Sequence, residues 1–371
     1  MRAAVVAGEA RPLPIGVTLA RGVLVLGGAT LLLVTLVVLA VAIGSAHVGI
    51  WDTAAILGRR LLALPIPETW AATSEKIIFD IRLPRVLTAV LVGGGLAMAG
   101  TVFQALLRNP LADPYVIGTA AGASLGAVLG IVAPLLLPGL AIGAGTSWLG
   151  LGLIQVLAFA GGLATVLLVY AVARGSGRVQ VVTLLLTGYA VSSVLAAMVA
   201  LLMFVSGRAL GAVFGWLMGS LADASWIGLG FAAPLMLVSL VLLLVRWRRL
   251  NVLLLGDAHA ASLGVNVERE KLVLTMLATL ATSAAVAISG TIGFVGLVVP
   301  HLLRLLIGPD HRLLLPASML CGASLLVAAD LGARLVPGGG IPVGVVTALI
   351  GAPFFLWLLR RSRLVRAELR P

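Results

Sequence analysis

The sequence predicts an all-helical integral membrane protein with about ten transmembrane helices. Of its 371 residues, 61% are hydrophobic and only 10% are charged, and the mean hydropathy is +1.19. Soluble domains carry about 25% charged residues, so these few charges cannot cover the surface of a water-soluble fold of this size. The 45 glycines favour a tightly packed bundle, because small residues let membrane helices approach closely.

Ten apolar runs approach the roughly 20 residues needed to cross the hydrocarbon core of a bilayer. They cover residues 23–46, 86–107, 115–136, 149–173, 181–205, 226–245, 272–290, 294–307, 313–331 and 342–359. The first run is too long for a signal-peptide core and lacks a convincing cleavage site, so we interpret it as a span. The eighth is short, and we expect a partial helix with irregular backbone around Gly293 and Gly296, which is tolerated only where protein buries it.

The basic residues predict that both termini lie in the cytoplasm. An even number of spans places both termini on one side. With the termini inside, 18 of the 25 lysines and arginines fall in inner segments and seven in outer ones. We therefore expect cytoplasmic tails at residues 1–22 and 361–371, and one transmembrane domain at 23–360 with a cytoplasmic segment at 247–271. Arginines in such loops are topology signals, so nucleic acid is not an expected partner.

The apolar runs lack the groups that ion coupling or hydrolysis would need. No Asp, Glu, Lys or Arg occurs within 86–107, 115–173 or 272–303. Coupled transporters usually bind their ion at an ionisable group at mid-depth, although sodium sites made of carbonyls remain open. Both lysines follow a glutamate, so neither belongs to a Walker A loop. The four histidines lack metal-ligand spacing and Cys321 is the only cysteine. We expect no catalytic residues and no metal site.

Five sequence strings carry a resemblance to a known family. They are Ile81–Arg85 (IRLPR), Leu107–Pro114 (LRNPLADP), Ser289–His301 (SGTIGFVGLVVPH), Pro309–Pro316 (PDHRLLLP) and Ile341–Pro353 (IPVGVVTALIGAP). Together they closely resemble the FecCD family, the permease subunits of type II ABC importers for iron–siderophores, haem and vitamin B12. The resemblance extends from about residue 20 to residue 361 in the order of the family.

The resemblance implies a fold of ten transmembrane helices and a set of partners. The permease would form a homodimer in the inner membrane, with the transport pathway at its two-fold axis. Two ATP-binding subunits would attach on the cytoplasmic side and a periplasmic binding protein would deliver the substrate. ATP and magnesium would belong to the ATPase chain, so this chain would bind no cofactor and would not be an enzyme.

Three outer arginines match positions at which the family receives acidic residues of the binding protein. They are Arg82, Arg85 and Arg334. Arginine suits this role because its rigid fork pairs with a carboxylate through two hydrogen bonds. The alternative is that these arginines only extend from helix ends to the membrane interface. Asp330 lies four residues before Arg334 and is expected to neutralise part of its charge.

The inner segment contains a match to the coupling helix of the family. The residues concerned are Gly256, Asp257, Ala258, His259, Ala260, Ala261, Ser262, Leu263 and Gly264. We expect Asp257 to cap the start of this helix and Gly264 to end it, with the small residues seated in a cleft of the ATPase. The family often has an acidic residue where His259 stands. The alternative is a loop helix without a coupling role.

The cytoplasmic gate of the family corresponds to two short segments, with Asn109, Pro110 and Leu111 in the first and Gln180, Val181 and Val182 in the second. Two-fold symmetry would bring copies of these residues face to face, where small movements open or close a narrow ring. The pathway itself would be lined by the spans 86–107, 181–205 and 342–359. Ordinary helix packing is the alternative role for each gate residue.

The cargo is expected to be a bulky metal chelate. An iron–siderophore complex is favoured because it is the commonest cargo of the family, and haem and cobalamin are the alternatives. Two other classes of protein remain open, an ion-coupled secondary transporter and a membrane scaffold or enzyme that does not transport. Transport driven only by a proton or sodium gradient, without ATP, would indicate the secondary transporter. Failure to find any ATPase partner would favour the scaffold or enzyme.

Overall fold

The computed structural model describes residues 15–44, 46, 48–136, 152–175, 180–336 and 340–361, and those residues form helices joined by short connections. In chain order the elements are α1 (Ile15–Ala42), α2 (Ile50–Leu62), α3 (Ala72–Lys76), the π-helical turn η1 (Ile77–Arg82), α4 (Leu83–Leu106), α5 (Thr119–Leu136), α7 (Leu153–Arg174), α8 (Val181–Val205), the 3-10 turn η2 (Gly207–Ala209), α9 (Leu210–Leu217), α10 (Trp226–Val245), α11 (Trp247–Leu254), α12 (Asp257–Ser262), α13 (Val267–Ser289), α14 (Val295–Ile307), α15 (His311–Leu335) and α16 (Val343–Arg361).

Each of the ten expected apolar runs contains a helix. Among the described residues, seven helices are long and apolar enough to cross a membrane, and three shorter apolar helices are α5, α14 and α16. The predicted all-helical membrane fold is therefore confirmed. The bounds of α8 and α10 agree with the predicted runs, whereas α1 is already helical at Ile15, where the described part of the chain starts. The expected tail at 1–22 thus includes helix from residue 15, and residues 1–14 and 362–371 lie outside the described part.

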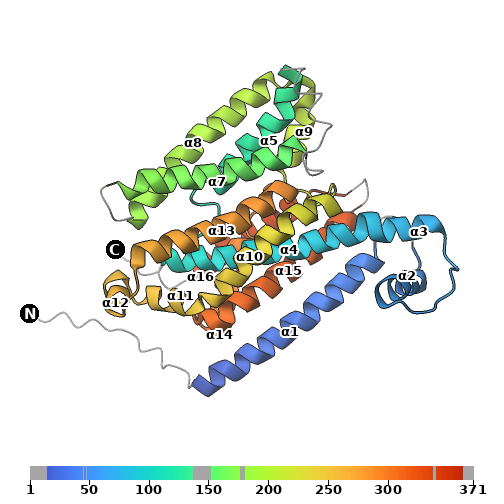
Figure 1. Cartoon of the computed structure of the whole chain (residues 1–371), viewed down its shortest axis with the longest axis horizontal. Coiled ribbons are helices and arrows are strands. Elements are labelled where there is room, and N and C mark those ends of the chain that lie inside the picture. The colour runs from blue at the N-terminus through green and yellow to red at the C-terminus, as the bar shows by residue number, and fades with distance from the viewer. Residues whose placement is uncertain are drawn as a thin grey trace, which may run out of the picture.

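The helix that carries the second run is longer than a bilayer requires. Residues Ala72–Leu106 form one continuous helical segment of 35 residues through α3, η1 and α4. At about 1.5 Å per residue it is roughly 50 Å long, compared with a hydrocarbon core of about 30 Å. Its first turns therefore extend beyond the bundle, where they lie next to α2 (Figure 1).

The helix α4 forms the centre of the larger group of helices. It packs against α10, α13, α14 and α15, while α5, α7, α8 and α9 form a second group on one side (Figure 1). In Figure 1, α1 lies at the opposite edge, and α12 and α2 lie at opposite ends of the bundle. Most of α4 is buried inside the chain, so it does not offer a free face to a pathway between two subunits. The expectation that the span 86–107 lines such a pathway is therefore wrong for most of its length.

Two pairs of glycines bring α4 into backbone contact with its neighbours. A Cβ atom on Gly100 would lie 1.7 Å from the carbonyl oxygen of Gly296 in α14. A Cβ atom on Gly93 would lie 2.4 Å from the carbonyl oxygen of Gly322 in α15. Both clashes would be with backbone rather than with a side chain that could rotate away. The high glycine content is thus used at helix crossings, as the sequence predicted.

The backbone between α13 and α14 is irregular, as expected for the eighth run. Phe294, which precedes α14, has a φ of 68°, and the 13 residues of α14 are short for a complete span. Polar groups in this break have protein partners. The Tyr115 hydroxyl accepts a hydrogen bond from the Ile292 amide at 3.3 Å and donates one to the Ile292 carbonyl at 3.1 Å. Thr291 donates to the Leu217 carbonyl. Protein therefore satisfies groups that lipid could not.

We predict that Gly100→Ala destabilises the protein strongly, because the new methyl group would collide with the Gly296 carbonyl and force α4 and α14 apart. Overpacking of this kind typically costs about 1–3 kcal/mol. Thermal unfolding of the purified protein in detergent measures the effect. Gly230→Ala in α10 is the matched control, since nothing lies within 4 Å of its Cβ position. Equal melting temperatures for the two variants would contradict this account of the helix crossing.

Candidate functional site

A π-helical turn sets the direction of the arginines in the first motif. The turn Ile77–Arg82 leads directly into α4, whose second residue is Pro84. Proline has no amide hydrogen to donate to the preceding turn, so a locally widened helix accommodates it without a break. The extra residue in the turn changes the register along the helix. Arg82 then points toward the end of α1, and Arg85 points toward α15.

Arg82 binds the carbonyl groups at the carboxyl end of α1. Its guanidinium donates to the carbonyl oxygens of Val41 at 2.9 Å and Ala42 at 2.7 Å, and also to that of Ala46. The residue is only 3% exposed. Carbonyls at a helix end lack partners inside the helix and carry partial negative charge, so a cation stabilises them.

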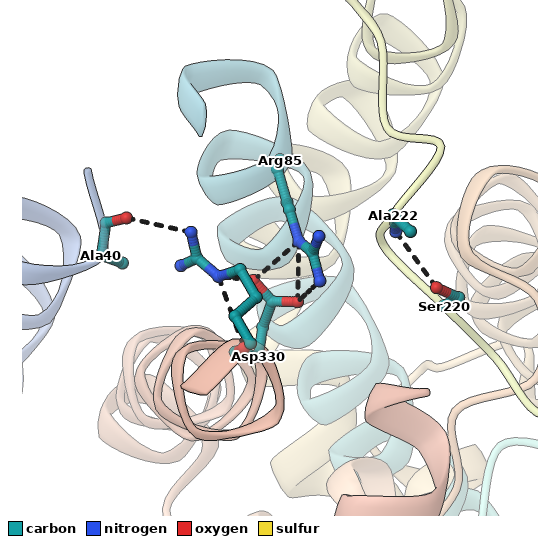
Figure 2. Close-up of polar contacts among 6 residues, drawn as sticks. Ala40, Arg85, Ser220, Ala222 and Asp330 are labelled. Carbon is teal, nitrogen blue, oxygen red and sulfur yellow. Dashed lines mark hydrogen bonds and ion pairs between the residues drawn. The ribbon is translucent and has the colours of Figure 1, made fainter. Parts of the chain in front are cut away.

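Asp330 of α15 is a buried carboxylate shared by two arginines. Arg85 donates to Asp330 Oδ1 through Nε at 3.0 Å and through Nη2 at 2.9 Å, and Figure 2 shows these two side chains facing each other. Arg334 approaches Asp330 Oδ2 at 3.1 Å and donates to the Ala40 carbonyl at 3.2 Å. The carboxylate is 1% exposed. This arginine–aspartate cluster therefore ties α1, α4 and α15 together.

The three arginines expected to receive the binding protein thus lie together at the end of the bundle that carries α2. The structure gives each of them an internal partner, and the side chain of Arg85 is 18% exposed compared with 8% for that of Arg334. Their docking role stays a prediction. The pairing of Arg334 with Asp330 could be predicted, because the two residues are four positions apart on one helix. The pairing of Arg85 with Asp330 joins residues 245 positions apart, so no local sequence pattern could predict it.

We predict that Asp330→Asn lowers the stability of the fold. Asparagine keeps the shape of the side chain but leaves Arg85 and Arg334 beside each other without a counter-charge, and breaking a buried ion pair typically costs about 3–5 kcal/mol. Thermal unfolding in detergent measures the loss. The control is Asp223→Asn, which neutralises an exposed carboxylate in the connection before α10. A melting temperature as high as that of the control would show that the carboxylate is not needed to hold the cluster.

At the opposite end, α12 buries one side chain and exposes the others. Ala260 is completely buried, whereas Asp257, Ala258, His259, Ala261, Ser262 and Leu263 are exposed. The helix ends as predicted at Gly264, which has a φ of 78°. The Gly264 amide donates to the Ala261 carbonyl and the Val265 amide to the Ala260 carbonyl, which is the Schellman pattern of hydrogen bonds. A short, exposed helix of small residues is a suitable surface for another protein.

Asp257 does not cap α12, contrary to expectation. Gly256 occupies the cap position without a side-chain hydrogen bond, and the Asp257 carboxylate instead pairs with Lys271 at 2.6 Å and with Arg108. Partial burial would raise the pKa of this carboxyl, but the hydrogen bond and charge of Lys271 and the charge of Arg108 hold it below its ordinary value. The carboxylate is therefore ionised at neutral pH, and these ion pairs are lost only when the pH falls through that lowered pKa.

The first gate segment is a tight loop directly after α4. Asn109 and Pro110 are exposed and Leu111 is half-buried. The Asn109 side chain accepts from the Leu111 amide at 3.0 Å, and the Asp113 side chain accepts from the Tyr115 amide at 2.8 Å. These turns give the loop a defined shape, because each side chain takes the place of a backbone partner.

The second gate segment begins α8. Gln180 is exposed and precedes the helix, Val181 is half-buried, and Val182 is 66% exposed. Val181 packs against an apolar cluster that also contains Leu107 and Ala112, which flank the first segment. Within one chain the two segments are therefore neighbours of the same core. Their action as a gate stays a prediction.

The described residues contain no group of three or more His, Cys, Asp or Glu side chains arranged to hold a metal ion. Cys321 is unpaired in α15. Whether this chain works without a cofactor of its own stays a prediction.

Comparison with known proteins assigns this fold to a family. The FecCD transport family model matches residues 31–361. The chain is 43% identical over 317 residues to the cobalamin import system permease protein BtuC of Halobacterium salinarum, covering 85% of this chain and 81% of that protein. It is 43% identical over 338 residues to the hemin transport system permease protein HmuU of Yersinia pestis, covering 90% and 95%. A solved structure described as an inward-facing metal-chelate type ABC transporter shares 34% identity with a TM-score of 0.76, covering 91% of this chain and 99% of that one.

The fold and these comparisons define a multi-pass membrane permease subunit of an ABC importer for metal chelates. The chain belongs to the FecCD transport family, as its motifs indicated. It is not itself an enzyme, because the ATPase of such an importer is a separate subunit, and its class implies an ATPase and a binding protein as partners.

Proposed function

We propose that this chain conducts a bulky metal chelate from a periplasmic binding protein across the inner membrane to the cytoplasm. The observation that carries the proposal is the 43% identity to a hemin permease over 90% of this chain. The two relatives differ in cargo by name, cobalamin in one and hemin in the other, so a large metal chelate is what their names share. A ferric siderophore is the cargo to test first, because the family resemblance favours it.

The working unit in this proposal is a homodimer with two ATPase subunits. The exposed apolar faces of α8 and α16 support it, since Tyr189 is 74% exposed, Phe204 87% and Leu349 67%. In the dimer, parts of α8 and α16 would border the pathway between the two copies, and the rest would face lipid. The segments Asn109–Leu111 and Gln180–Val182 would narrow that pathway on the cytoplasmic side.

The two ends of the bundle would have different partners. The end that carries α12 would face the cytoplasm, because α12 and the basic segment around it match the coupling region of the family. The end that carries α2 and the arginine–aspartate cluster would then face the periplasm and receive the binding protein. This orientation agrees with the distribution of basic residues and places both termini in the cytoplasm.

We predict that scrambling the exposed residues 258, 259 and 261–263, with the buried Ala260 kept, abolishes the control of the ATPase. The exposed side chains of α12 would no longer fit the ATPase, whereas Ala260, Asp257 and Gly264 would keep the loop in place. Co-purification of the ATPase and its stimulation by the permease are the measurements. A scramble of the outer segment 64–69 is the control, because it lies at the α2 end. Normal ATPase binding and stimulation after the α12 scramble would contradict the coupling role.

We predict that one class of chelate raises the ATPase activity of the reconstituted complex at least several-fold. The panel consists of ferric siderophores, haem and cobalamin, each supplied with its candidate binding protein. A ferric siderophore is the expected activator. If only haem or only cobalamin stimulated the ATPase, that compound and not a siderophore would be the cargo, and the cargo would still be a metal chelate. No stimulation by any chelate would contradict the proposed function.

A further inference from the structure

Arg108 joins the first gate segment to the region that contains α12. It directly precedes Asn109, and its side chain extends away from the loop toward two elements far along the chain. Its Nε donates to the carbonyl of Leu253 in α11 at 3.3 Å, and its Nη2 donates to the carboxylate of Asp257, the first residue of α12. One side chain therefore contacts both the carboxyl end of α11 and the first residue of α12.

The backbone at Arg108 has a conformation that normally favours glycine. Its φ is 47°, in the left-handed region. The Arg108 amide donates to the Ala105 carbonyl and the Asn109 amide to the Gln104 carbonyl, so α4 ends in the same Schellman pattern as α12. At the end of α12 the left-handed position is Gly264, whereas at the end of α4 it is an arginine. The arginine therefore stands where a glycine would be less strained, and its side chain makes the two hydrogen bonds described above.

The ion pair does little to stabilise the fold. The side chains of Arg108 and Asp257 are 44% and 49% exposed, and exposed pairs contribute little to stability. Asp257 also retains Lys271 of α13 as a second partner at 2.6 Å. Packing between the same elements is provided separately, because Leu107 and Ala112 share an apolar cluster with Leu253, Ala260 and Val265. Arg108 thus adds hydrogen bonds of fixed direction to an interface that apolar side chains already pack.

We propose that Arg108 is a positioning residue that transmits movement of α12 to the loop Asn109–Leu111. When α12 moves with its partner, the guanidinium bound to Asp257 and Leu253 follows, and the backbone of the loop follows the guanidinium. The apolar cluster keeps the two elements together, and Arg108 determines how a displacement of one changes the other. This inference rests on the proposed function, in which α12 contacts the ATPase and Asn109–Leu111 narrows the pathway.

The test is Arg108→Gly in the complete complex with ATPase and binding protein. Glycine fits the left-handed backbone better than arginine, so the variant should fold and melt at the same temperature as the unaltered permease or higher. The ATPase should still co-purify, because α12 is unchanged. Transport per ATP hydrolysed should fall roughly tenfold, in the range of ordinary coupling between two sites. Arg269→Ala, which removes an exposed arginine from α13 near the same end, should keep the normal ratio.

A second comparison identifies Asp257 as the partner through which Arg108 acts. If the two residues act through each other, Asp257→Asn should lower transport per ATP, and the double variant with Arg108→Gly should be no worse than Arg108→Gly alone. A normal ratio in Arg108→Gly, or loss of the ATPase from that variant, would overturn the positioning role. If the unaltered permease itself failed to bind or stimulate the ATPase, the proposed function would fail instead, so the two failures are distinguishable.

Discussion

The close contact of α4 with α14 and α15 is the constraint on which the rest of the structure depends. At Gly100 and Gly93 the backbones touch so closely that a single methyl group would not fit. The hydrophobic effect does not drive helices together inside a membrane, so van der Waals contact of this kind has to hold the bundle. Because α4 is fixed in this way, the residues at its two ends, Arg85 and Arg108, have defined positions relative to α15 and α12.

Much of the fold could be predicted from the sequence, because long apolar runs have few structures open to them in a membrane. The irregular eighth span was also predictable, since Gly293 and Gly296 interrupt a short run. The burial of α4 was not, because an apolar helix does not reveal which of its faces meet protein. The partners of Arg82, Arg85 and Asp257 were missed for a related reason. They lie tens to hundreds of residues away, and a single sequence records no such contact.

The two ends of the bundle use charge in different ways. At the α2 end the charges of the arginine–aspartate cluster are largely buried and hold helices together. At the α12 end the side chains of Arg108 and Asp257 are about half-exposed, and α12 is attached to the bundle mainly through Ala260. A tightly paired α2 end and a lightly attached α12 suit a permease that receives its energy from a separate subunit. The lack of Asp, Glu, Lys and Arg along the stretches 86–107 and 272–303 agrees with that division of labour.

The most direct test is to measure which energy source drives transport. The permease is reconstituted in liposomes with its ATPase, and uptake of chelate delivered by the binding protein is measured with ATP, and separately with a proton or sodium gradient in the absence of ATP. Uptake should require ATP and the binding protein, and it should be unchanged when both gradients are collapsed. Uptake driven by a gradient without ATP would contradict the proposed function and would identify the chain as an ion-coupled secondary transporter.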